Sequence, residues 1–185
     1  MRDDLALIES GEKPAPELEG KDGEVDLFGA TGARELNDKF VNLRDSVHSS
    51  ASREIMSELM HWFDDPDGNF VKDFQTNGFD GRLWELFLFA AFSEMGFTLD
   101  RSKPTPDFRL SKGDQKVFVE AVTANPSFGE QFDISGPPPP PPENFAHYIE
   151  NEMPQKFGSP LRSKVTKAYW KAPDVAGNPF VIAIA

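Results

Sequence analysis

The stretch that decides the fold consists of three apolar pieces, GRLWELFLFAAFSEMGF at 81–97, PDF at 106–108 and VFVEAV at 117–122. The first piece is apolar on almost every side, which predicts a buried helix over 81–95 that stops at Gly96. The two later pieces have the length and bounding turn residues of strands. The acids Glu85, Asp107 and Glu120 lie in the first, second and third piece respectively.

The same criteria, applied to the rest of the chain, predict an α/β fold. Apolar residues recur at helical spacing over 34–63, with a break near Ser49, so an extra helical region precedes the central stretch. The expected strands lie at 97–100, 107–110, 116–122 and 179–185, and two further helices are expected at 144–153 and 159–170.

The chain divides into a flexible acidic leader over 1–33, a helical region over 34–78 and a core over 79–185. A proline-rich insertion occupies 126–143, and its unbroken run of prolines is expected to be a polyproline II spacer or a ligand for a proline-recognising protein. The last apolar strand ends at the final residue, so it either lies between two other strands or belongs to a chain that is truncated at its C-terminus.

Composition narrows the classes of function. The chain of 185 residues has no cysteine, which excludes disulfides, thiolate nucleophiles and cysteine zinc sites. It lacks a long apolar signal or membrane-spanning stretch, so we expect no membrane partner and a cytoplasmic location. The net charge of -12 argues against general attraction to nucleic acid, but the charge is uneven, because 156–171 holds five basic residues and no acid.

The three acids suggest a metal site. Burial of an ionised acid without a partner costs several kcal/mol, so Glu85 needs a cation, a metal ion or a pairing with Arg82. Asp107 alone is a common turn residue, whereas Glu120 lies within a run that is apolar on both faces. Together, Glu85, Asp107 and Glu120 form a hard oxygen site suited to Mg2+ or Mn2+.

Other chemistries lack their motifs. The three histidines have no paired metal-ligand spacing, and no serine has a recognisable activating context. No glycine-rich phosphate loop, nucleophile elbow or dinucleotide fingerprint occurs. Phosphoryl transfer assisted by a metal ion is therefore the chemistry that the acids favour.

The order of these residues resembles the PD-(D/E)XK nuclease superfamily, whose restriction-endonuclease-like core runs helix, three strands, helix, strand and implies a mixed central sheet. The resemblance covers about 79–185 and implies that Asp107 and Glu120 hold Mg2+ or Mn2+ with support from Glu85. It also implies a lysine two residues after the second acid, where this chain has Val122. In some members a neighbouring element supplies that cation, and Lys164 and Lys167 are the candidates here.

The resemblance implies metal-dependent hydrolysis of DNA phosphodiester bonds, with Glu85, Asp107, Glu120 and Lys164 as the catalytic set. The rival hypotheses are a catalytically inactive module that kept the nuclease fold for binding, and a truncated gene product. A homodimer and a protein partner for the proline run are further expectations about association.

Overall fold

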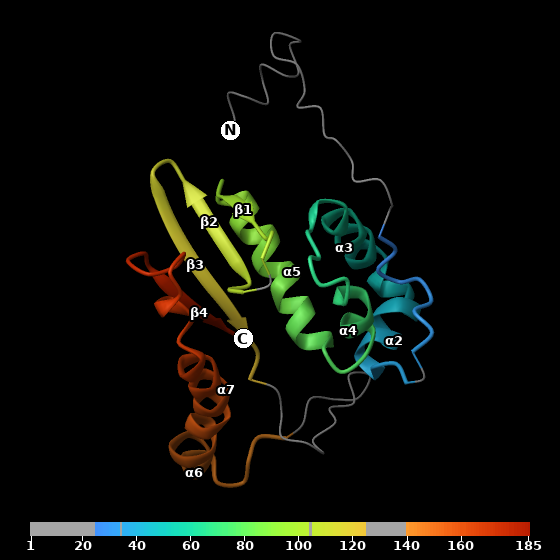
Figure 1. The fold of residues 1–185 in the computed structure, drawn as a ribbon. Coiled ribbons are helices and arrows are strands. Elements are labelled where there is room, and N and C mark those ends of the chain that lie inside the picture. The colour runs from blue at the N-terminus through green and yellow to red at the C-terminus, as the bar shows by residue number, and fades with distance from the viewer. Residues whose placement is uncertain (1–24, 34, 104, 125–139) are drawn as a thin grey trace.

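The computed structural model describes residues 25–33, 35–103, 105–124 and 140–185, and it has the mixed α/β architecture expected from the sequence (Figure 1). A four-stranded sheet has the order β1-β2-β3-β4. The strands are β1 (Thr98–Asp100), β2 (Phe108–Lys112), β3 (Gln115–Val122) and β4 (Phe180–Ile184). The predicted mixed sheet is confirmed, because β1, β2 and β3 pair antiparallel whereas β3 and β4 pair parallel.

The helices gather mainly on one side of this sheet (Figure 1). They are α2 (Asp38–Asp45), η1 (Val47–Ser49), α3 (Ser50–Trp62), α4 (Phe70–Gln75), α5 (Phe79–Glu94), α6 (Phe145–His147), η2 (Tyr148–Glu152), α7 (Met153–Lys167) and η3 (Tyr169–Lys171). Helix α5 packs on β1 and β3, and α7 contacts β3 and β4. The connection from β3 to β4 therefore carries α7 between two adjacent parallel strands, as such a crossover requires.

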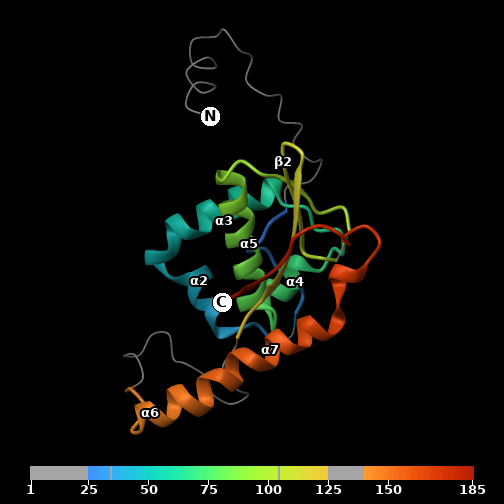
Figure 2. The same ribbon diagram turned by 90° about the vertical axis from the view of Figure 1, so that its left-hand side faces the viewer.

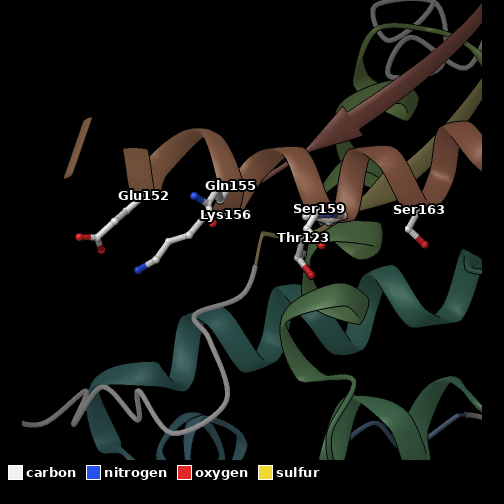
Figure 3. A pocket seen from close by; sticks show the side chains of 7 residues that line it. Thr123, Glu152, Gln155, Lys156, Ser159 and Ser163 are labelled. Carbon is white, nitrogen blue, oxygen red and sulfur yellow. The ribbon is translucent and has the colours of Figure 1, made fainter. Parts of the chain in front are cut away.

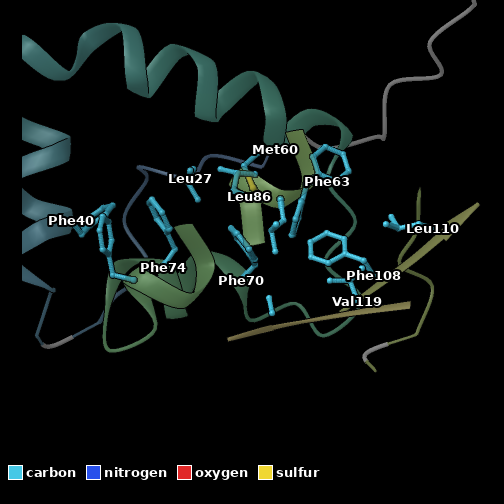
Figure 4. Close-up of a cluster of buried hydrophobic side chains, with 14 residues drawn as sticks. Leu27, Phe40, Met60, Phe63, Phe70, Phe74, Leu86, Phe108, Leu110 and Val119 are labelled. Atoms are coloured by element: carbon cyan, nitrogen blue, oxygen red, sulfur yellow. The ribbon is translucent and has the colours of Figure 1, made fainter. Parts of the chain in front are cut away.

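The core lies between α5, the N-terminal helices and the near face of the sheet (Figure 4). Apolar residues alternate along β3, so Val119 and Ala121 join the core while Phe118 and Glu120 point to the opposite face. Helix α5 begins at Phe79, two residues before the predicted start, and its C-terminal end is followed by Gly96 with φ +75°, a conformation that favours glycine.

The end of the segment assigned to the acidic leader packs on the helical region. Leu27 is fully buried in the core, and the amide of Gln75 donates to the carbonyls of Leu27 and Gly29 at 3.0 and 2.7 Å. Gln75 is itself buried, so these bonds compensate its lost hydration. Residues 25–33 are thus part of the folded body, whereas 1–24 lie outside the described residues.

The two helices predicted over 144–153 and 159–170 are one continuous helical run (Figure 2). It starts at Phe145, widens to a π turn over Tyr148–Glu152 and continues as α7 to Lys167. The residues between the two expected helices, 154–158, are helical as well, and the helix continues through Pro160, which has no N–H to donate to the preceding turn.

The structure tests the expectations about the proline-rich insertion and about membrane spans only for the described residues. Most of the proline-rich insertion over 126–143 lies outside the described residues, which resume at 140. None of the described helices is long and apolar enough to cross a membrane.

Candidate active site

The centre of the candidate site is an ion pair between the sheet and α7. Glu120 lies on β3, which has a strand on each side, and is only 2% exposed on the face opposite the main core. Lys164 Nζ lies 2.6 Å from Glu120 Oε1. The other oxygen, Oε2, is buried and has no hydrogen-bond partner among the described residues. Of the two lysines expected to replace the missing cation, the structure brings Lys164 to the acid, whereas Lys167 is exposed.

The electrostatic surroundings affect both partners. Burial raises the pKa of Glu120, and the negative charge of Asp107 raises it further, while the hydrogen bond from Lys164 opposes the change. Burial lowers the pKa of Lys164, but the hydrogen bond and charge of Glu120 outweigh burial, so the net shift is upward. Lys164 therefore remains a cation at neutral pH.

Asp107 lies directly before β2 and reaches across to β3. Its Oδ2 accepts a hydrogen bond from the backbone N–H of Ala121 at 2.7 Å. Ala121 follows Glu120, so this bond holds the Asp107 carboxylate beside the Glu120 position. The structure thus brings together Asp107, Glu120 and Lys164 from the start of one strand, the middle of the next and the crossover helix.

Glu85 on α5 has different partners. Its Oε1 lies 3.0 Å from Arg82 Nη1, and its Oε2 lies 3.2 Å from Arg101 Nη2. The pairing with Arg82 was one of the alternatives drawn from the sequence. Burial raises the pKa of Glu85, and the charge of Asp107 adds to that effect, while the two arginines oppose it. Glu85 is therefore close enough to Asp107 to be affected by its charge, but it is bound to arginines.

Arg101 was missed by the sequence reasoning. It follows β1 in a polar turn, yet it is only 7% exposed, and its guanidinium lies 3.8 Å from the ring centre of Phe63 and 4.9 Å from that of Phe108. Burial lowers its pKa, although Glu85 opposes the shift. Its Nε and Nη1 atoms have no hydrogen-bond partner among the described residues. The signal that could have found it is the buried Glu85, which required a cation.

A cavity of about 260 Å³ lies beside Glu85, Asp107 and Lys164, whereas Glu120 is not one of the residues that line it. It is lined by Asp65, Pro66, Asp67, Arg82, Glu85, Arg101, Lys103, Asp107 and Lys164. Four of these residues are basic and four are acidic, so the cavity is polar but nearly balanced in charge. Such a lining offers N–H donors to an anionic group and carboxylate oxygens to a cation.

A cluster of ion pairs includes Lys103, one of the residues that line this cavity. Asp174, in the turn before β4, lies 2.9 Å from both Lys103 Nζ and Arg109 Nη1. The hydrogen bonds from Lys103 and Arg109 lower the pKa of Asp174 to about 2. The cluster therefore ties the approach to β4 against the β1–β2 end of the sheet.

A second hollow of about 610 Å³ lies along α7 (Figure 3). It is lined by Thr123, Glu152, Gln155, Lys156, Ser159, Pro160 and Ser163. Thr123 follows the end of β3, and Ser163 precedes Lys164 in the helix. Hydroxyl and amide groups therefore extend from the neighbourhood of the ion pair along the helix.

The three candidate acids do not form a preformed set of metal ligands. Within 25–33, 35–103, 105–124 and 140–185, no three histidine, cysteine or carboxylate side chains form a group that could hold a metal ion. The reason is that Glu85 is bound to Arg82 and Arg101, which leaves Asp107 and Glu120 as a pair. The magnesium site thus stays a prediction.

Comparisons of the chain with protein-family models, with curated proteins and with solved structures found no match. The functional argument therefore rests on the residues and their geometry.

Proposed function

We propose that the chain is a metal-dependent nuclease of the restriction-endonuclease-like fold, which hydrolyses phosphodiester bonds in DNA. The observation that carries the proposal is the contact of 2.6 Å between Lys164 Nζ and the buried Glu120, beside Asp107. A cation is needed near the second acid, and Val122 cannot supply one. Lys164 brings it from the crossover helix instead.

The order of the elements supports the same proposal. Helix α5, three antiparallel strands, helix α7 and a final parallel strand follow one another as in the core of the PD-(D/E)XK superfamily. The candidate residues occur in the corresponding order, with Glu85 on the first helix, Asp107 and Glu120 at successive strands and Lys164 on the second helix. A fold alone does not define an activity, so the proposal rests mainly on the charged residues of the site.

The donor atoms of the site fit a hard divalent cation. Glu120 Oε2 is buried and has no hydrogen-bond partner in the described part of the chain, and carboxylate oxygens are the ligands that Mg2+ and Mn2+ prefer. Asp107 and Glu120 would hold such an ion, and Glu85 would support it. When bound, the ion would lower the pKa of water and offset charge on a phosphate.

The residues of the chain have separate roles in this proposal. Lys164, which stays charged, orients the attacking water or stabilises the phosphate. Asp107 is fixed by the Ala121 N–H and so does not have to reorganise. Arg82, Arg101 and Lys103, which line the cavity, would contact the anionic phosphate.

The test is cleavage of plasmid and single-stranded DNA by the purified chain with Mg2+ or Mn2+. Glu120→Ala, Asp107→Ala and Lys164→Met should each lower the rate by at least about a hundredfold. Lys167→Met is the matched control, because it removes the same charge from an exposed site three residues along α7 and should leave the rate unchanged. No cleavage by the parent chain, or equal cleavage by the variants, would refute catalysis.

A second candidate function is phosphate binding without cleavage. It is favoured by Arg101, whose Nε and Nη1 atoms are buried at the cavity and have no partner among the described residues. Unpaired guanidinium N–H groups suit a phosphate oxygen. Calorimetry separates the candidates: binding of a short oligonucleotide that does not depend on Mg2+, together with no measurable Mg2+ affinity, favours the binding module. Strong Mg2+ binding that Glu120→Ala abolishes favours the nuclease.

The proposed location is the cytoplasm, because the absence of cysteine is compatible with a reducing compartment.

A further inference from the structure

A row of apolar side chains runs along the helix formed by α6, η2 and α7 and lies outside the hydrophobic core of the described residues. Phe145, Ile149, Phe157, Leu161 and Val165 are each between 39% and 60% exposed, and Met153, which continues the row, is half-buried. These residues follow one another at intervals of four. Rows with this interval form the ridges that interlock in the commonest class of helix packing.

The row faces away from the hollow along α7. Ser159 and Ser163 line that hollow, and each lies two residues, or about 200° around the helix, from Phe157 and Leu161 respectively. The first part of the helix also projects from the body, and the main contacts of α7 with the sheet are those with β3 and β4 (Figure 2). An apolar ridge on a projecting helix is an exposed patch of the kind that marks a protein interface.

The charges of the helix identify the partner. Its first half, over 145–155, contains two acidic residues and no lysine or arginine, whereas its second half, over 156–167, contains four basic residues and no acid. A second copy placed antiparallel would set the acidic half of each helix against the basic half of the other. A parallel copy would set like charges together, and an unrelated partner would need the opposite charge order.

The register follows from the ridge. A twofold axis at Gln155 sets Phe157 against the partner's Met153, and Leu161 against the partner's Ile149. The same register brings Glu150, on one flank of the ridge, to the partner's Arg162, and the reverse contact occurs by symmetry. Glu150 and Arg162 are both exposed, and neither makes an ion pair with a described residue of its own chain.

We infer that this chain forms an antiparallel homodimer through the apolar ridge of the helix over 145–167, with Glu150 and Arg162 of the two copies forming paired ion bridges. The inference does not depend on the nuclease proposal. The ridge and the charge order are needed for association, whereas the carboxylates of the candidate site are not.

Sedimentation equilibrium of the full chain, on the order of 1 to 100 µM, is the primary experiment. The parent chain should dimerise, and Phe157→Glu should weaken the dimer by at least about thirtyfold, as expected for loss of a central anchor. Val47→Glu is the control, because Val47 is an exposed apolar residue on a different element, and it should leave the dimer intact. A monomeric parent, or a dimer unaffected by Phe157→Glu, would overturn the inference.

Exchange of the two charges tests the register. The double variant also serves as a control in case a single variant fails to fold. Glu150→Arg and Arg162→Glu should each weaken the dimer, because the symmetry places two like-charge contacts in each complex. The double variant should restore the affinity to within about threefold of the parent, since both bridges form again with reversed charge. Circular dichroism monitors the helix. A folded double variant that stays monomeric would overturn the antiparallel register.

Discussion

Replacement of Lys164 by methionine should destabilise the fold as well as alter the candidate site. The Glu120 side chain is only 3% exposed and the Lys164 side chain 21%, so the variant leaves a buried carboxylate without its cation. Loss of one partner of a fully buried pair costs about 3 to 5 kcal/mol. Because Lys164 is partly solvated and Glu120 can take up a proton, we expect a loss of about 2 to 3 kcal/mol at neutral pH.

The assay is urea unfolding, with the free energy of unfolding extrapolated to water. Lys167→Met is the control, and because Lys167 is exposed near Tyr169 it should cost less than about 1 kcal/mol. The double variant Glu120→Leu and Lys164→Met should recover most of the stability, since an apolar pair needs no charge compensation.

The pH dependence gives the assay a second measurement. The pKa of Glu120 is already raised by burial and by Asp107, and without Lys164 it rises further. An acid with a raised pKa in the folded state takes up a proton as pH falls, which removes the buried charge. The penalty of Lys164→Met should therefore shrink between about pH 8 and about pH 5. A loss below about 0.5 kcal/mol, or a penalty that grows as pH falls, would refute the argument.

Three further predictions concern other contacts. The pKa of Asp174 is lowered to about 2, so the stability that its ion pairs contribute is complete above its ordinary pKa and is lost as pH falls toward 2. Carboxyl NMR titration should give this pKa. Asp174→Asn should remove the part of the acid dependence of stability that comes from Asp174. Gln75→Leu leaves two backbone carbonyls unpaired near Leu27, and it should cost about 2 kcal/mol and speed hydrogen exchange over 25–33. Trp84→Phe removes the bond of 3.1 Å from the indole N–H to the Ala183 carbonyl, so it should cost about 1 kcal/mol in thermal unfolding and speed exchange in β4.

The central elements were predictable because local patterns specify them. Helix α5 and strands β2 and β3 lie within two residues of the expected positions, since an apolar run, turn residues and strand length identify each of them. The expectation that Glu85 needs a buried partner was also sound, because the cost of an unpaired charge does not depend on the fold.

The features that could not be predicted from the sequence depend on contacts between distant segments. Arg101 lies in a polar turn, and its burial follows from the packing of Phe63 and Phe108 around it. Lys164 and Lys167 were equivalent candidates, because helical spacing does not specify how α7 docks on the sheet. The helix between the two expected segments was missed, since 154–158 contains a proline and a glycine, which have the lowest intrinsic helix propensities.

The separation of Glu120 and Lys164 along the chain, 44 residues, also has a consequence for folding kinetics. The β2–β3 hairpin can form from neighbouring residues, but the ion pair requires closure of the long crossover to α7, and such distant contacts form late. A contact that is absent from the folding transition state stabilises only the native side of the barrier. Lys164 should therefore slow unfolding while it barely changes the rate of folding, so this single cation would set much of the lifetime of the assembled sheet.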